Sequence, residues 1–220
     1  MRRSSNIPTA AALACLAAMI AGCGGRSEPP PINYHLAAAA DVAQVRRVVF
    51  VELPPEDGYA GVAEDTTVAL AEAIRSLRLF RLDVVRHDDP ICSTLSLDEP
   101  RGFTLEQLRT MRETFRCDAI LLGRLRNFRP HPCMRLGLDL RLLDLRQGKP
   151  LWVVDQTWDT TDKVVEKRIK KYYRRQMRSG LEPMEWQIVT ISPQAFEKYV
   201  AYETACTLAP PPRVEDDLDD

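Results

Sequence analysis

The sequence has little that would place it among proteins with several membrane spans or among the common enzyme classes. Its 220 residues contain one long uncharged apolar stretch, near the N-terminus, and a mean hydropathy of −0.25 leaves no room for further spans. It has no nucleophile elbow, no phosphate-binding loop, no zinc-protease helix and no internal repeat. The formal net charge is only −1, and the 45% hydrophobic content is ordinary for a globular chain, which excludes disorder throughout. One domain with flanking segments is therefore expected.

The N-terminus has the pattern of an export signal. Arg2 and Arg3 precede an apolar core at 10–21, which is too short for a comfortable membrane span. The run Ile20-Ala21-Gly22-Cys23 resembles the lipobox of bacterial lipoproteins. That resemblance implies removal of a signal peptide, 1–22, and a diacylglyceryl group on Cys23. The alternative is a plain signal peptide with an accidental cysteine.

The rest of the chain divides into a tether, a folded domain and a tail. Residues 23–44, with a proline run at 29–31, are predicted to be a lipidated tether. The domain is expected at 45–208, followed by a disordered tail at 209–220 that is first proline-rich and then acidic. Gly24 is not aspartate, which in a Gram-negative bacterium implies sorting to the outer membrane, facing the periplasm.

Hydrophobic patterning predicts an α/β (α+β) domain. Strands are expected at 47–53, 82–86, 118–128, 134–142 and 151–159, helices at about 65–77, 104–115, 163–177 and 193–207, and a loop at 87–102. Thr104 with Gln107 predicts a capping box, and Ser192 with Pro193 predicts the start of the last helix. The helix between each of the first three strands makes those strands parallel, and hairpins add the last two. The prediction is therefore a mixed five-stranded sheet of order 2-1-3-4-5, with helices packed on it and further helices at the C-terminal end.

Three passages carry a family resemblance. They are Phe115-Arg116-Cys117-Asp118-Ala119-Ile120-Leu121-Leu122-Gly123, Leu140-Arg141-Leu142-Leu143-Asp144 and Gly148-Lys149-Pro150-Leu151-Trp152. They resemble the CsgG-like envelope lipoproteins and the lipoprotein activators of penicillin-binding proteins. The resemblance implies a mixed sheet with flanking helices at the inner face of the outer membrane. It implies binding or scaffolding rather than a pore, because the chain lacks added amphipathic strand pairs. Gly123 is expected to allow close approach to a central strand.

Four cysteines remain once Cys15 and Cys23 are set aside. An even number in an exported chain suggests disulfides. Cys92 and Cys133 both follow the carboxyl ends of parallel strands, which favours the pair Cys92–Cys133 and, more weakly, Cys117–Cys206. The alternative is four buried free thiols.

The helix expected at 163–177 has the strongest local charge. Eight basic residues at 163–178 stand against Asp162 and Glu166, a balance of +6. An anionic surface is predicted to contact Lys167, Lys170, Lys171, Arg174, Arg175 and Arg178. The alternative is a docked helix with a solvated basic face.

No metal or other cofactor is expected. His131-Pro132-Cys133 and His87-Asp88-Asp89 lack a recognised ligand spacing. The leading functional hypothesis is a non-enzymatic, membrane-anchored envelope lipoprotein that acts as an adaptor or assembly factor for a protein partner. The alternative is a structural module that binds anionic lipid or envelope polymer through the basic helix. An oligomer is possible, and nucleic acid is not an expected partner.

Overall fold

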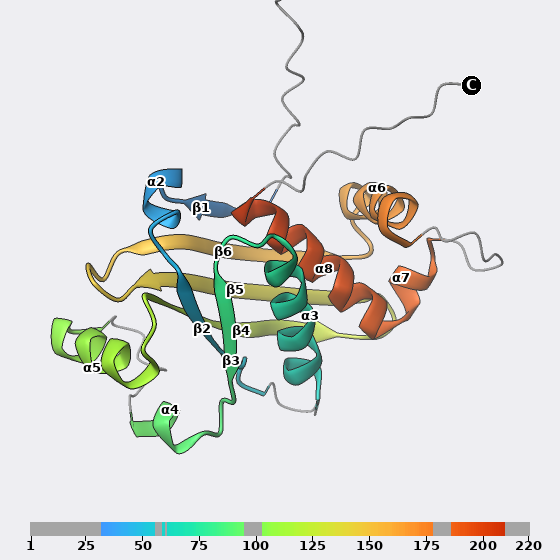
Figure 1. Ribbon diagram of the computed structural model, residues 1–220. Coiled ribbons are helices and arrows are strands. Elements are labelled where there is room, and N and C mark those ends of the chain that lie inside the picture. The colour runs from blue at the N-terminus through green and yellow to red at the C-terminus, as the bar shows by residue number, and fades with distance from the viewer. Residues whose placement is uncertain (1–31, 56–58, 60, 95–102, 178–185, 210–220) are drawn as a thin grey trace, which may run out of the picture.

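The computed structural model describes residues 32–55, 59, 61–94, 103–177 and 186–209. One mixed sheet organises this part of the chain (Figure 1). Its strands are β1 (Tyr34–Leu36), β2 (Arg47–Val51), β3 (Arg81–Val85), β4 (Ala119–Arg129), β5 (Arg135–Asp144) and β6 (Pro150–Asp159). The helices are α2 (Ala39–Val42), α3 (Val62–Ser76), α4 (Pro90–Thr94), α5 (Leu105–Phe115), α6 (Lys163–Tyr172), α7 (Ile188–Ile191) and α8 (Pro193–Leu208), and a π-helical turn, η2 (Tyr173–Met177), continues α6. None of the described helices is long and apolar enough to span a membrane.

The sheet has the order β1-β6-β5-β4-β2-β3. Strand β2 is parallel to β3 and β4, and every other pair is antiparallel. The α/β class is confirmed, and β2 to β6 have the neighbours that the hydrophobic pattern predicted. The predicted number of five strands, and with it the complete order, is wrong because β1 adds to the outer edge of β6.

The folded part also begins upstream of the boundary predicted at residue 45. Tyr34 and Leu36 pair with Val154 and Trp152 of β6, and Ile32 is buried in the core. Residues 32–44 therefore belong to the sheet and its edge rather than to a tether. The predicted signal peptide and the acidic tail lie outside the described residues.

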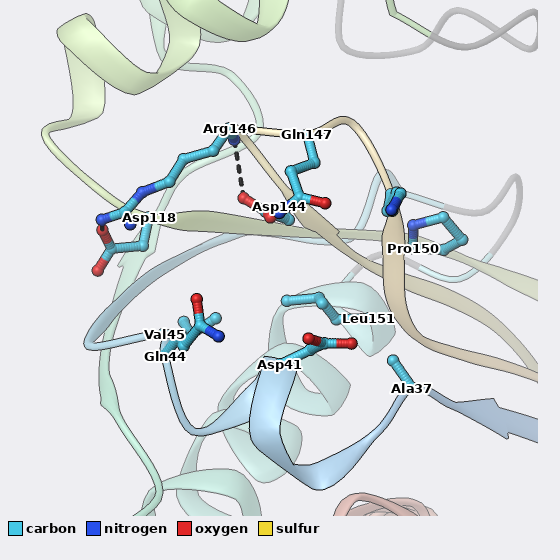
Figure 2. A pocket seen from close by; sticks show the side chains of 11 residues that line it. Ala37, Asp41, Gln44, Val45, Asp118, Asp144, Arg146, Gln147, Pro150 and Leu151 are labelled. Carbon is cyan, nitrogen blue, oxygen red and sulfur yellow. Dashed lines mark hydrogen bonds and ion pairs between the residues drawn. The ribbon is translucent and has the colours of Figure 1, made fainter.

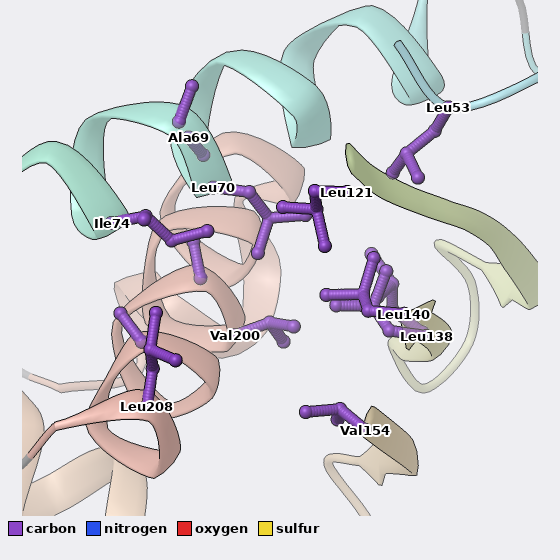
Figure 3. Close-up of a cluster of buried hydrophobic side chains, with 14 of the residues drawn as sticks. Leu53, Ala69, Leu70, Ile74, Leu121, Leu138, Leu140, Val154, Val200 and Leu208 are labelled. Atoms are coloured by element: carbon purple, nitrogen blue, oxygen red, sulfur yellow. The ribbon is translucent and has the colours of Figure 1, made fainter. Parts of the chain in front are cut away.

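Two hydrophobic cores cover the two faces of the sheet. Along β2, Val48 and Phe50 point into the larger core, while Val49 and Val51 point into the smaller one, as the two-residue period of a strand requires. Helices α3, α6 and α8 close the larger core, whose side chains from α3, α8 and the central strands meet in Figure 3. Helices α4 and α5 close the smaller core. Helix α4 lies in the segment that was expected to be a loop.

Local sequence signals account for the helix ends. Thr104 and Gln107 form the predicted capping box of α5. Ser192 caps α8 by accepting from the N–H of Ala195, with Pro193 in the first turn. The N-cap of α3 is instead Gly61, at φ 90°, so this helix starts earlier than predicted.

Gly123 permits the close approach predicted for it. A Cβ atom at this position would lie 2.4 Å from Leu140 Cδ2 and 2.7 Å from the carbonyl oxygen of Asp139. We expect Gly123→Ala to lower the free energy of unfolding by about 1–3 kcal/mol through overpacking. Chemical denaturation measures the change. Arg129→Ala, at an exposed position of the same strand, is the control and should change stability by less than about 0.5 kcal/mol. Equal stability of the two variants would contradict the expectation.

Candidate functional site

The helix α6 is fixed by its apolar face. Asp162 caps it by accepting a hydrogen bond from the N–H of Val164 at 2.8 Å. Val165, Ile169 and Tyr172 follow at helical spacing and are buried. The Tyr172 ring packs on Tyr199 of α8, with ring centroids 5.4 Å apart. This docking leaves the opposite face of α6 in solvent.

The basic residues of α6 and η2 divide into three groups that differ in their contacts. Arg168 points inward, where its Nη2 lies 3.3 Å from Glu203 Oε2. Lys170 Nζ lies 2.6 Å from Glu166 Oε1 and 4.2 Å from the centre of the Trp186 ring. Hydrogen bonds from Lys163 and Lys170 lower the pKa of Glu166 to about 2, so this carboxylate stays charged and holds both lysines.

The third group consists of basic residues that are exposed. We call these four the cationic stripe: Lys167, Lys171, Arg174 and Arg175. Lys167, Lys171 and Arg174 follow at intervals of four and three residues, and Arg175 is four residues after Lys171, which places them along one side of a helix. The ion pairs that α6 makes with described residues involve Lys163, Arg168 and Lys170, and they leave the stripe uncompensated. Lys170, which was predicted to contact the anionic surface, is thus occupied elsewhere, and Arg178 lies outside the described residues.

A buried polar network holds α6 against α8 and β6. Glu203 accepts hydrogen bonds from Trp158 Nε1 at 2.8 Å and from Tyr199 Oη at 2.9 Å, beside Arg168. The side chains of Arg168 and Glu203 are only 13% and 9% exposed. Burial raises the pKa of Glu203, although the charge of Arg168 and the two hydrogen bonds oppose the rise. The network fixes the orientation of α6, and with it the direction in which the stripe faces.

The predicted disulfides are not formed in the structure. Cys117, Cys133 and Cys206 are free thiols, and Cys92 Sγ donates to the carbonyl oxygen of Arg86 at 3.3 Å. Cys117 lies in the smaller core, whereas Cys206 is carried by α8, which packs on the opposite face of the sheet. Burial raises the pKa of both Cys117 and Cys206 to about 11, which keeps these thiols protonated at neutral pH.

The candidate His87-Asp88-Asp89 makes local contacts through the backbone of His87 and the side chain of Asp88. The N–H of His87 donates to Glu52 Oε2 at 3.0 Å, and Asp88 pairs with Arg86 at 3.0 Å. Within 32–55, 59, 61–94, 103–177 and 186–209, no group of three or more His, Cys, Asp or Glu side chains could hold a metal ion.

A small polar cavity of about 180 Å³ lies where β2 and β4 begin, beside the turn between β5 and β6 (Figure 2). Asp118, from the first of the family-like passages, is its most connected residue. It accepts from the backbone N–H groups of Arg46 and Arg47 at 3.0 and 3.2 Å, and pairs with Arg146 at 2.9 Å. Burial opposes ionisation of Asp118, but these hydrogen bonds outweigh it and lower its pKa. Asp118 therefore joins the ends of three elements, and its polar atoms are satisfied within the fold.

No protein-family model matches the chain, and no curated protein matches it. Three solved structures illustrate the structural likenesses found. A PelC dodecamer from Paraburkholderia phytofirmans has a TM-score of 0.42 and 11% identity, covering 62% of this chain and 86% of that one. Lipoprotein GNA1162 from Neisseria meningitidis has a TM-score of 0.38 and 13% identity, covering 59% and 96%. The hypothetical protein CT253 from Chlamydia trachomatis has a TM-score of 0.40 and 12% identity, covering 74% and 99%.

At these identities and TM-scores, the likenesses support no inference about this chain. The predicted kinship with the CsgG-like lipoproteins therefore stays a prediction. What the described residues offer is an exposed basic surface without an ion pair to another described residue, and such a surface can bind an anion without making or breaking a covalent bond.

Sequence reasoning identified the basic helix but not the way its charges divide. Arg168 is three residues after Val165 and four before Tyr172, so it lies on the buried side of the helix. That position is a sequence signal that could have separated Arg168 from the stripe. The partner Glu203 has no such signal near Arg168 in the sequence, because the two residues meet only through the packing of α8 on α6.

Proposed function

We propose that the chain is a lipid-anchored protein of the bacterial envelope that catalyses no reaction and binds anionic phospholipid headgroups through the cationic stripe. The observation that carries the proposal is the row of four exposed basic side chains without an ion pair to any described residue. The lipobox-like run ending at Cys23 supplies the anchor.

The position of the stripe supports an approach to the membrane that holds the anchor. Strand β1 forms one edge of the sheet, and helix α6 lies on that side of the domain in Figure 1. Residues 24–31 separate Cys23 from the buried Ile32, and a chain of this length extends at most about 30 Å. An acyl group on Cys23 would therefore keep the stripe close to the headgroups of the same bilayer.

Physical chemistry makes this a two-signal arrangement. The two acyl chains of a diacylglyceryl group on Cys23 are the first signal and hold the protein at the bilayer. A basic patch near an anionic surface is the second and adds about 1 kcal/mol for each Lys or Arg. Lys167 and Lys171 are carried by α6, whose other face is buried. Arg174 and Arg175 are carried by η2, where the partly buried Tyr173 and Met177 pack against the larger core. The four side chains are therefore held together before the surface is met. Binding then orients the domain on the bilayer rather than merely attaching it.

The test measures binding of residues 24–220, which retain every described residue but carry no acyl chain, to phosphatidylglycerol-containing vesicles. The stripe is neutralised by Lys167→Gln, Lys171→Gln, Arg174→Gln and Arg175→Gln. Four charges at about 1 kcal/mol each would contribute about 4 kcal/mol to binding, and we expect about half of this to be lost at low salt, which weakens binding about 30-fold. Co-sedimentation or tryptophan fluorescence gives the dissociation constant. Binding of the parent chain should also weaken as salt is added.

A matched control removes the same charge elsewhere. The variant combining Arg46→Gln, Arg112→Gln, Arg129→Gln and Lys149→Gln changes exposed residues that lie outside α6 and η2. It should bind within about threefold of the parent chain if the stripe rather than net charge is responsible. Binding that is insensitive to salt, or equal losses in the two variants, would overturn the proposal. Preference for lipopolysaccharide over phospholipid vesicles would also overturn it in favour of an envelope polymer.

A protein adaptor is a second candidate, favoured by the outer face of β4 to β6. Arg124 and Arg141 lie 3.1 and 3.6 Å from the same carboxylate, that of Asp139, and both arginines are more than half exposed. Arg126 and Arg135 pair with Asp155 and Asp159 on β6. These ion pairs lie on one face of the sheet and give a partner protein fixed polar groups to recognise. If stripe variants bind vesicles as well as the parent chain does, the adaptor becomes the leading function.

A further inference from the structure

The chain carries an acidic segment that complements the cationic stripe in charge. Residues 215–220 read Glu-Asp-Asp-Leu-Asp-Asp and contain five carboxylates. The stripe presents four basic side chains that no described residue neutralises. The two charge clusters are similar in number and opposite in sign, and they belong to one molecule.

The fold places the start of the connecting chain near α6. Glu203 of α8 lies 3.3 Å from Arg168 of α6, and Leu208, the last residue of α8, is about 7.5 Å further along the helix axis. From Ala209 to Glu215 the chain advances six residues, which reach at most about 20 Å when fully extended. That reach covers both the roughly 7.5 Å back along α8 to the level of Glu203 and the width of α6, which is about 10–12 Å with its side chains. The acidic segment can therefore reach the outer face of α6.

We infer that residues 215–220 bind the cationic stripe within the same chain and compete there with anionic lipid. The inference rests on the proposed function for its consequence, because it regulates access to that site. A short tether gives the segment an effective concentration in the millimolar range. Even a weak contact therefore occupies the stripe in a fraction of the molecules. The apparent affinity for an anionic surface falls in proportion to that fraction. Salt weakens both the internal contact and the lipid contact.

The contact itself is tested without a membrane. A zero-length carbodiimide cross-linker applied to residues 24–220 at low protein concentration should join Lys167 or Lys171 to carboxylates of 215–220. Mass spectrometry of proteolytic fragments identifies the joined residues. The exposed Lys149 is the internal control, because it lies outside the stripe but three residues from Trp152, whose Nε1 donates to Thr207 near the end of α8. It should form such cross-links at least fivefold less often if the stripe rather than mere proximity to the tail is responsible. The cross-links should decline as salt is added. Their absence from Lys167 and Lys171 would overturn the inference.

The competition is tested on phosphatidylglycerol-containing vesicles with the acidic segment neutralised by Glu215→Gln, Asp216→Asn, Asp217→Asn, Asp219→Asn and Asp220→Asn. Binding should tighten about three- to tenfold at low salt and by much less at high salt. A control neutralises exposed carboxylates elsewhere, by Asp41→Asn, Glu64→Gln, Glu72→Gln, Glu106→Gln and Glu113→Gln. Similar tightening in the two variants would show a net-charge effect and overturn the competition.

The outcomes separate this inference from the proposed function. Cross-links together with selective tightening support both. Cross-links without vesicle binding by any variant would leave the internal contact standing and overturn the proposed function. Vesicle binding that depends on the stripe, without cross-links, would do the reverse.

Discussion

Replacement of Arg168 by methionine should lower the free energy of unfolding by about 3–5 kcal/mol, measured by chemical denaturation. Methionine keeps most of the length and apolar contact of the arginine but leaves Glu203 without its opposite charge. The Glu203 side chain is 9% exposed and accepts hydrogen bonds from Trp158 and Tyr199, so it cannot turn to solvent without breaking the network. A buried carboxylate without a counter-charge accounts for the size of the expected loss.

Two further variants show whether burial of the charge is the cause. Arg168→Met combined with Glu203→Gln removes both charges but keeps an acceptor for Trp158 and Tyr199, and should recover more than half of the loss. Arg109→Met breaks the exposed pair with Glu113, at 2.9 Å, and should cost less than about 1 kcal/mol. A loss at Arg168 as small as that at Arg109 would contradict the account of the buried pair.

Replacement of Glu197 by glutamine should stabilise the protein at neutral pH and above. Glu197 lies on α8 and is 3% exposed. Desolvation, with a contribution from the negative charge of Asp65, raises its pKa from 4.5 to about 7. The folded state therefore favours the neutral carboxyl group. Its contribution to stability is complete below pH 4.5 and is lost as the pH rises through about 7.

The expected loss between these pH values is about 3 kcal/mol in the parent chain. Free energies of unfolding measured from pH 4 to pH 8 should therefore fall less steeply in Glu197→Gln, and the two curves should diverge toward pH 8. The exposed Glu72→Gln is the control and should follow the parent curve. Parallel curves for Glu197→Gln and the parent chain would show that Glu197 ionises without cost in the folded state.

The parts of the fold that the sequence predicted are those governed by local patterns. The alternation of Leu136, Leu138, Leu140 and Leu142 with polar residues defined a strand that is buried on one face. Thr104 with Gln107, and Ser192 with Pro193, marked two helix starts correctly. Each of these signals acts within a few residues, so no tertiary contact is needed to interpret it.

The elements that were missed depend on distant partners. Strand β1 has three residues, and only its pairing with β6, more than a hundred positions later, makes it a strand. Helix α4 is five residues long and is held by contacts of Cys92 in the smaller core. Segments this short carry too little periodicity to be distinguished from a loop.

The candidate site shows the same division. The local excess of basic residues at 163–177 could be counted from the sequence, and it indicated an anion-binding helix. Which charges remain available depends partly on packing between elements, because Glu203 and Trp186 reach Arg168 and Lys170 in this way. The ion pair of Lys170 with Glu166, four residues earlier, is by contrast a local spacing. Helical spacing could have placed Arg168 on the buried side, but nothing near Lys170 in the sequence pointed to Trp186.

The pairing of β1 with β6 has a mechanical consequence for an anchored protein. Tension applied through a lipid on Cys23 would enter the domain at Ile32 and load β1 first. The ladder holding β1 is short, with Tyr34, His35 and Leu36 facing Val154, Val153 and Trp152. A pull directed away from the sheet would open these pairs one at a time, whereas a pull along the strand would load them together. Detachment of β1 would then lengthen the chain and lower the tension before the leucine-rich core is loaded, so this edge strand would open before the core does.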